Sequence, residues 1–347
     1  MTYCLGWKTK NSVFIAADSA VTISSASAPS PPLSSFGEVS YRDNTNHVYE
    51  GLLKVCVVDR AIVAFSGCVQ TALNIIRTFE EVVKIDQNIP DGFKKAVLSS
   101  GPYTKDNDIA LILGYYDKDG PILISYNHDG KRSIDDHDQC VQIGSVGSIY
   151  RVSSEIVIGT FLHGNLGDEH MLAAVTSVLQ SYGIFDQMMR MNVGGVFFGA
   201  SADSNGVSWQ RDTSYFLYPP NLSISHFISV YSIDNALGIA SSFVGPKVFM
   251  NTVNTGDVKE WQGRWMSELK EKLNSGKSIF YTFLSMKDRL ITVIKKTDNS
   301  NDRYFKMQAE HLDGKEKYTF SFSPELVELL NYTKPDGDEF RFNWRND

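Results

Sequence analysis

The sequence predicts an α+β fold in which sheets stack on each other with helices outside, followed by a C-terminal extension. Strand and helix signals come in blocks, in the order strands, two helices, strands, two helices, strands. That order differs from the strict alternation of a doubly wound α/β fold. The pattern changes after Pro219-Pro220. We therefore expect a core over residues 2–218 and an α+β extension over residues 219–347.

Alternating side chains and turn signals predict the strands of the core. Tyr3, Leu5 and Trp7 alternate with smaller or polar residues, and the stretch 117–120 reads Asp-Lys-Asp-Gly, a hairpin signal. The Ser- and Pro-rich residues 23–37 predict a loop. The expected core strands are residues 3–9, 13–18, 54–65 (a pair with a tight turn at Asp59-Arg60), 109–116, 121–126, 140–143, 194–200 and 207–216.

Helical periodicity predicts two pairs of helices in the core. The clearest is residues 69–83, where the apolar side chains recur on one face. The other core helices are expected at residues 91–99, 149–162 and 168–184. In the extension we expect strands within 222–255 and at 278–285, 289–296, 303–309 and 317–322, an amphipathic helix at 257–275 and a short helix at 324–332.

Composition narrows the functional class. The net charge of −7 over 347 residues argues against nucleic-acid binding, which usually needs a basic face. No apolar run reaches the roughly 18 residues of a membrane span. Four scattered cysteines indicate buried, reduced thiols in a cytoplasmic protein. No Walker loop or GxGxxG motif occurs, so no cofactor is expected. The acids and histidines between His128 and Asp138 are interpreted as a solvated loop, and no metal is expected.

Thr2 carries the strongest chemical signal. A threonine at the mature N-terminus holds a hydroxyl nucleophile and a free amine on one residue, and this is a recognised way to activate a hydroxyl. The amine has an ordinary pKa of about 7.7–8.0, so it can act as a base near neutral pH. The small Thr2 side chain favours removal of Met1.

With these features the chain resembles the proteasome β-subunit family of N-terminal nucleophile hydrolases. Its opening, MTYCLG, is most similar to the bacterial proteasome-like Anbu group. The resemblance covers about residues 2–216. It is carried by Thr2, the strand end 16–19 (Ala-Ala-Asp-Ser), Lys54 at the start of a strand and the stretch 64–67 (Ala-Phe-Ser-Gly) before a helix. Gly144-Ser145 and Gly194-Gly195 support it more weakly.

The resemblance implies a four-layer αββα sandwich and a role for each site residue. Thr2 Oγ would attack a carbonyl and the Thr2 amine would take the proton. Lys54, paired with Asp18, would stay charged and favour the alkoxide. The Gly67 N–H, near a helix start, would bind an oxyanion. Ser145 would support the Thr2 amine.

The sequence also departs from the family pattern. Ala20 stands where members usually carry an arginine, and the 36 residues from Asp18 to Lys54 are more than usual. Near Gly194-Gly195, where active members place an aspartate and a serine, this chain has Arg190 and Val193. Asp186 or Asn192 would compensate only through a shift of register.

The resemblance therefore predicts a threonine peptidase that cleaves peptides or unfolded protein through a Thr2 acyl-enzyme. Family members form rings or helical arrays, so a homo-oligomer is expected. The extension is expected to cap the subunit, alter assembly or recruit a partner. Two alternatives stay open: a catalytically inactive scaffold on the same fold, and a hydrolase of small amides, because a fold does not determine its substrate.

Overall fold

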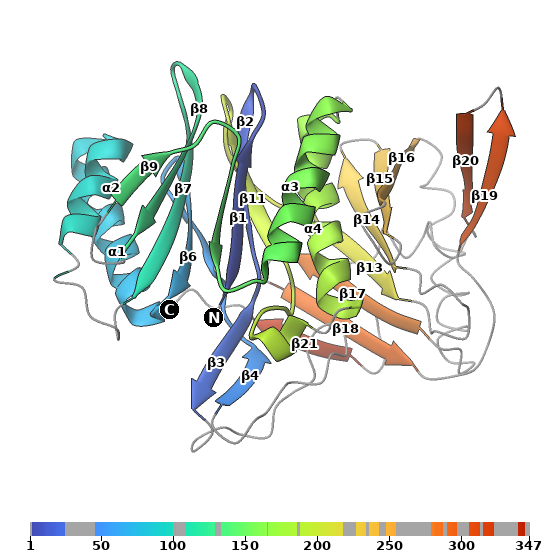
Figure 1. The fold of residues 1–347 in the computed structure, drawn as a ribbon, viewed down its shortest axis with the longest axis horizontal. Helices are drawn as coiled ribbons and strands as arrows, with labels where there is room; N and C mark the ends of the chain where they lie inside the picture. Colours follow the sequence, from blue (N-terminus) through green and yellow to red (C-terminus); the bar gives the residue numbers. More distant parts are fainter. Residues whose placement is uncertain are drawn as a thin grey trace. The chain divides into compact units, whose positions relative to one another are not determined.

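The protein is a mixed α+β structure with antiparallel sheets and, in the residues described, four α-helices (Figure 1). The computed structural model describes residues 2–24, 46–99, 101, 108–128, 133–164, 166–185, 188–217, 227–233, 236–242, 248–254, 279–286, 290–296, 305–312, 315–322 and 339–343. Two compact units divide at Gln210: Met1–Gln210 and Arg211–Asn343. The predicted α+β class is confirmed.

The chain's first residues form the middle of a five-stranded sheet in the first unit. Its strand order is β10-β1-β2-β11-β12, so the edge strand β10 pairs with β1. Tyr3 lies opposite Gly144 and Cys4 opposite Ala17, which brings three distant segments together. The strands are β1 (Tyr3–Lys8), β2 (Ser12–Ala17), β10 (Cys140–Gly144), β11 (Phe198–Asp203) and β12 (Gly206–Trp209).

A second five-stranded sheet in this unit has the order β5-β6-β7-β8-β9. Its strands are β5 (Val55–Val58), β6 (Ala61–Gly67), β7 (Ile109–Asp117), β8 (Gly120–Asn127) and β9 (Ser133–Asp136). A separate hairpin pairs β3 (Ala20–Ser24) with β4 (Asn46–Glu50). Neither β9 nor this hairpin follows from the sequence pattern, since both are short and β9 is mostly exposed.

The two five-stranded sheets pack face to face because glycines let their strands approach closely. A Cβ atom on Gly6 of β1 would stand 2.8 Å from Leu123 Cδ1 and 2.9 Å from Ile112 Cγ2 on the other sheet. A Cβ on Gly114 of β7 would stand 2.9 Å from Val13 Cγ2. Larger residues at these positions would push the sheets apart.

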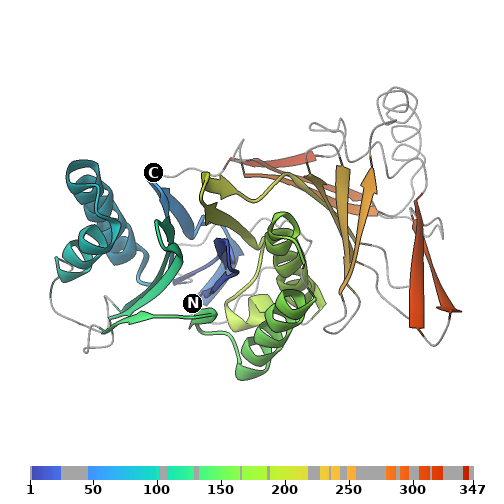
Figure 2. The same cartoon turned by 90° about the horizontal axis from the view of Figure 1, so that it is seen from above.

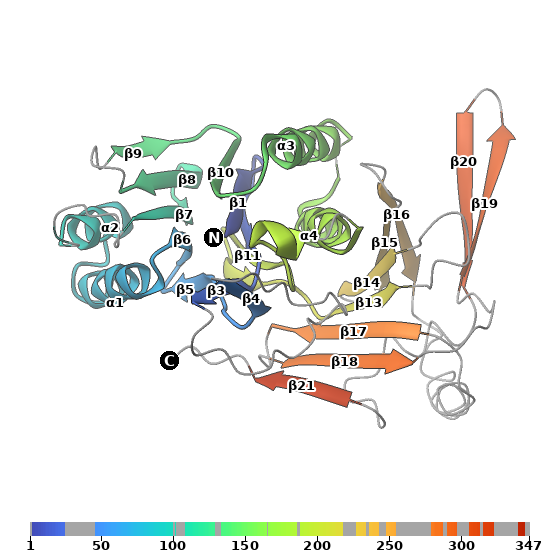
Figure 3. The same cartoon turned by 60° about the horizontal axis from the view of Figure 1, so that its bottom comes forward.

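The helices form two pairs, as the sequence predicts. α1 (Val69–Asp86) and α2 (Ile89–Leu98) pack on the β5–β9 sheet, and their apolar faces share one core with β6, β7 and β8. α3 (Ser148–His163) and α4 (Asp168–Phe185) pack together, with α4 against β2 and β11. Figures 2 and 3 show the two pairs on opposite sides of the stacked sheets.

The second unit contains a seven-stranded antiparallel sheet of order β16-β15-β14-β13-β17-β18-β21 and a two-stranded ribbon, β19-β20. Its strands are β13 (Thr213–Leu217), β14 (Phe227–Ile233), β15 (Ala236–Ser242), β16 (Val248–Asn254), β17 (Ile279–Ser285), β18 (Leu290–Lys296), β19 (Phe305–Leu312), β20 (Lys315–Phe322) and β21 (Glu339–Asn343).

One strand prediction is wrong at the junction of the units. The single strand expected at residues 207–216 is two strands: β12 pairs with β11, while β13 pairs with β14 and β17. The Gln210 N–H donates to the Gly199 carbonyl, and the strand is interrupted there. The helices expected at 257–275 and 324–332 lie outside the described residues.

Candidate active site

Asp18 is the centre of the candidate site. It follows the last residue of β2 and is fully buried. Its Oδ1 accepts from the Tyr3 N–H at 3.0 Å and from Lys54 Nζ at 2.9 Å. Its Oδ2 accepts from the Gly194 N–H at 3.0 Å and the Ala20 N–H at 3.3 Å. Four donors therefore satisfy a carboxylate that would be very costly to bury alone.

Lys54 reaches Asp18 from the other sheet. It directly precedes β5, and its side chain is 2 % exposed. Its carbonyl accepts from the Phe65 N–H at 3.3 Å, so pairing with the adjacent strand β6 holds its backbone. Residues 36 positions apart in sequence thus form a buried ion pair, the pairing that the family resemblance implies. A fixed ammonium in a poorly solvated setting can stabilise negative charge that develops nearby.

Thr2 lies next to this pair. The peptide geometry keeps its Cα within about 2.5 Å of the Tyr3 nitrogen, which donates to Asp18. Thr2 is itself buried. Its carbonyl accepts from the Ser145 N–H at 2.8 Å. The structure therefore brings Thr2, Asp18, Lys54 and Ser145 together from three parts of the chain.

Gly67 ends β6, one residue before Cys68, the N-cap of α1. It is exposed and has a φ of +99°, and a Cβ there would stand 2.1 Å from the Asp108 carbonyl oxygen. Both features require glycine. Gly67 lies two residues beyond Phe65, whose backbone pairs with Lys54, so it occupies the same end of the sheet.

The Cys4 thiol is close to the ion pair but is poorly suited to act as a nucleophile. It is fully buried and donates to the Phe65 carbonyl at 3.2 Å. Burial raises the pKa of the thiol above its ordinary range, and the Asp18 charge raises it further, while Lys54 lowers it. Because the thiolate is the reactive form, Cys4 is expected to stay inert.

A glycine pair on the segment before β11 completes the surroundings of Asp18. Besides the Gly194 N–H to Asp18, the Gly194 carbonyl accepts from the Ser19 N–H at 3.2 Å. A Cβ at Gly195 would stand 2.5 Å from Ser19 Oγ. Gln180 of α4 holds the segment by donating to the Gly195 carbonyl at 2.9 Å. In the sequence, Gly194 is noted only as part of the family resemblance. Its hydrogen bond to Asp18 is visible only in the folded structure.

The residues at the positions that depart from the family pattern take part in packing or in other hydrogen bonds. Ala20 is buried against Val48 and Met189, and an arginine side chain would have to displace that apolar cluster. Val193 is fully buried. The Asn192 Oδ1 accepts from Thr22 Oγ1 at 3.3 Å, so this amide is engaged away from Asp18.

Arg190 belongs to a short 3-10 helix, Met188–Met191, and Asp186 lies outside the described residues.

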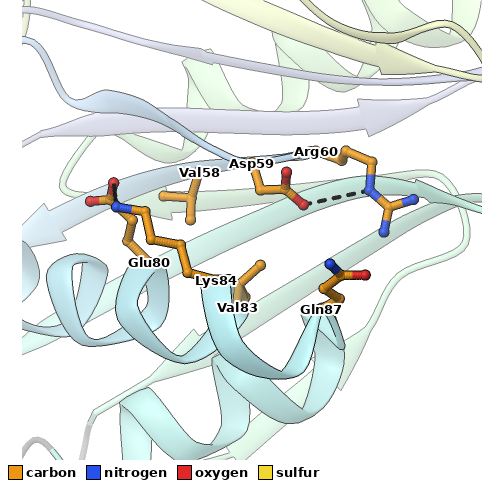
Figure 4. Close-up of a pocket in the computed structure, with 7 residues that line it drawn as sticks. All are labelled: Val58, Asp59, Arg60, Glu80, Val83, Lys84 and Gln87. Atoms are coloured by element: carbon orange, nitrogen blue, oxygen red, sulfur yellow. Dashed lines mark hydrogen bonds and ion pairs between the residues drawn. The ribbon is translucent and has the colours of Figure 1, made fainter.

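An open hollow of about 460 Å³ lies elsewhere in the first unit. It is lined by the β5–β6 turn and the end of α1 (Figure 4). Its charged side chains pair among themselves, Arg60 with Asp59 at 3.5 Å and Lys84 with Glu80 at 2.8 Å. Val58, at its edge, is a strand's length from Lys54, roughly 13 Å. The hollow is therefore distinct from the Asp18 site.

The acids and histidines considered for a metal belong to several local structures. His128 is buried with Nδ1 at 2.5 Å from the Tyr126 hydroxyl, and His137 Nε2 lies 2.8 Å from Ser125 Oγ. Within the described part of the chain, no group of three or more His, Cys, Asp or Glu residues is arranged to hold a metal ion. In that part, too, no helix is both long and apolar enough to cross a membrane.

Comparison with known proteins leaves the family open. No protein-family model matches the chain, and no curated protein matches it in sequence.

Proposed function

We propose that this chain is a proteasome-like threonine peptidase of the N-terminal nucleophile class. The observation that carries the proposal is the buried Lys54–Asp18 pair, 2.9 Å apart, whose shared oxygen also accepts the N–H that follows Thr2. An ion pair is expensive to bury, and one that adjoins an N-terminal hydroxyl residue suits a catalytic role. The resemblance of the residues around Thr2, Asp18 and Lys54 to the family supports the same reading.

The reaction would begin once Met1 has been removed. Thr2 Oγ would attack the amide carbonyl, and its proton would pass to the Thr2 amine. Lys54 would favour the developing alkoxide, and the Gly67 N–H would stabilise the oxyanion. The amine would then protonate the leaving nitrogen, which leaves an ester on Thr2. Water would hydrolyse that ester and restore the hydroxyl.

The proposal extends to the fold and to assembly. Helices on the outer sides of two stacked antiparallel sheets support a four-layer αββα sandwich for the first unit. Self-association into a ring or helical array, peptide or unfolded-protein substrates and a cytoplasmic location stay predictions. The role of the second unit stays open between capping, assembly and recruitment of a partner.

A second candidate, an inactive scaffold, is favoured by one observation. The positions where active relatives place an aspartate and a serine hold Arg190 and the buried Val193, and Asn192 bonds to Thr22. The support for the Thr2 amine would then have to come from Ser145.

Turnover by an untagged chain separates these functions. We expect the protein with a free Thr2 amine to cleave fluorogenic peptides faster than small amides, and Thr2→Ala to be inactive. An uncleaved N-terminal tag should abolish turnover, because it removes the amine. Full activity of a tagged, untrimmed protein would contradict the Thr2 mechanism. A lack of turnover in untagged protein with Met1 removed would favour the scaffold.

A further inference from the structure

Arg151, in the first turn of α3, binds three backbone carbonyls of the segment around Ser145, from Gln142 to Val146. Its Nη1 donates to the Gln142 carbonyl at 3.0 Å and its Nε to the Val146 carbonyl at 3.3 Å. Its Nη2 donates to the Gly144 carbonyl. The planar guanidinium can hold all three because its donors diverge in fixed directions, which a lysine cannot imitate.

The position of Arg151 is unfavourable for the helix itself. A cation in the first turn opposes the helix dipole, which favours acids there, and α3 has no acid in that turn. Contacts to the edge strand β10 compensate for this unfavourable position. The Gln142 and Gly144 carbonyls on the unpaired side of β10 need hydrogen-bond donors, and Arg151 provides them. The local cost to α3 is thus offset by contacts to the segment beside Thr2.

One peptide group transmits this contact to Thr2. The Gly144 carbonyl and the Ser145 N–H belong to the same trans peptide and point in opposite directions. Arg151 binds the carbonyl side, and the Thr2 carbonyl accepts from the N–H side at 2.8 Å. Gly144 has a φ of +105°, and a Cβ there would stand 1.8 Å from the Thr2 oxygen. Rotation of this peptide would therefore break both its hydrogen bond to Arg151 and its hydrogen bond to Thr2.

A second contact from α3 holds the next residue. The Tyr3 hydroxyl lies 2.6 Å from Gln142 Oε1 and 2.9 Å from Ser154 Oγ. The Gln142 Nε2 donates in turn to the Arg151 carbonyl at 3.0 Å. Residues 151 and 154 are three apart, so they share one face of α3. Both Thr2 and Tyr3 are thus tied to this helix.

We propose that Arg151 is a positioning residue that fixes the Thr2 nucleophile through the Gly144–Ser145 peptide. This inference rests on the proposed function of Thr2. Arg151 touches neither substrate nor the reacting atoms, so its loss should lower kcat and leave KM nearly unchanged. A displacement of about 1 Å in a nucleophile can cost about 100-fold in rate.

The test compares Arg151→Lys and Arg151→Ala with Arg77→Lys, an exposed arginine of α1, in the full-length protein. The first readout is hydrogen exchange at the Ser145 amide. The second is the rate at which a peptide β-lactone acylates Thr2. Arg151→Lys should accelerate the exchange and slow the acylation, each by about tenfold or more, because hydrogen bonds from a charged donor are lost. Arg77→Lys should change neither rate.

Rescue makes the test specific. Guanidinium ion at millimolar concentration, well below denaturing levels, should restore part of the acylation rate in Arg151→Ala and none in Thr2→Ala. If Arg151→Ala does not fold, the rates of Ser145 amide exchange and of Thr2 acylation are measured in Arg151→Lys alone. Ser145 exchange that is unchanged in Arg151→Lys overturns the proposal. Faster exchange with unchanged acylation also overturns it, because Thr2 then keeps its position without Arg151.

Failure of the proposed function gives a different result. If Thr2 of the wild-type protein never reacts while Ser145 exchange still responds to Arg151→Lys, the peptide contact is real but Thr2 is not a nucleophile. That result overturns both the function and the positioning role.

Discussion

Two lysine–carboxylate pairs of the first unit have nearly the same length and opposite surroundings. Lys54 and Asp18 are 2.9 Å apart, with side chains 2 % and 0 % exposed. Lys84 and Glu80 are 2.8 Å apart, with side chains 68 % and 49 % exposed. Contact distance therefore says little about what a pair does. Burial makes the first pair costly to break and electrostatically strong, while water screens the second.

The largest difference should appear when each lysine is removed. Lys54→Ala should abolish turnover and lower the free energy of unfolding by about 3–5 kcal/mol, because it leaves a buried carboxylate unpaired. Urea denaturation and peptide turnover measure the two effects. The double variant Asp18→Asn/Lys54→Met should regain only part of the stability, because the amide nitrogen of asparagine would face backbone N–H donors, and it should regain no activity. Unchanged turnover in Lys54→Ala would show that the pair is only structural.

The glycine beside Thr2 offers a second contrast between crowded and open surroundings. Gly144 and Gly120 have φ values of +105° and +121°, but a Cβ meets the Thr2 oxygen at the first and nothing within 4 Å at the second. Alanine should cost about 1–3 kcal/mol of backbone strain at either position. Gly144→Ala should cost about 1–3 kcal/mol more, from overpacking. Equal losses in thermal or urea unfolding would contradict the close fit at Thr2.

Burial should also control how stability depends on pH. Partial burial, with a smaller contribution from Glu155, raises the pKa of the Cys140 thiol from its ordinary value of 9.0 to about 12. The folded state then holds this proton more tightly than the unfolded chain. The contribution of Cys140 is therefore complete below about pH 9 and is lost as the pH rises toward 12.

This pH effect can be isolated with a variant. Between pH 8 and pH 10.5, wild type should lose about 1–2 kcal/mol more unfolding free energy than Cys140→Ala. Urea denaturation at the two pH values measures the difference. Equal losses in the two proteins would show that the thiol ionises freely in the folded state.

The smallest effect is expected at the exposed pair. Lys84→Ala should change the free energy of unfolding by no more than about 0.5 kcal/mol, with little effect on turnover, because helix-surface pairs of this spacing contribute little. Urea denaturation at low and high salt measures it. A loss above about 2 kcal/mol would mean that burial does not separate the two pairs.

Local patterns predict the four helices and most of the core strands, because each depends on a short stretch of sequence, but they do not predict β9 or the β3–β4 hairpin. Alternation identifies β1, and the apolar face of α1 sets its bounds to within a few residues. The exposed Lys84–Glu80 pair is equally local, since its residues are four apart on one helix. The strand pair β12 and β13 was missed because nothing local marks the change of partner at Gln210.

The candidate site is less local. Asp18 and Lys54 could be paired from the sequence only through the family resemblance, since 36 residues separate them. The contacts from Tyr3 and Gly194 to Asp18 are made by backbone N–H groups, which no residue type reveals. Arg151 has the appearance of a surface helix residue, and its place against the helix dipole is its only sequence signal.

Mass spectrometry of the N-terminus tests the central proposal most directly. Untagged protein should begin at Thr2, and after treatment with a peptide β-lactone a single adduct should map to Thr2. The adduct should be absent from Lys54→Ala and present in Lys84→Ala. Retained Met1, or an N-terminal Thr2 that stays unmodified in wild type while peptides are still cleaved, would contradict Thr2 as the nucleophile.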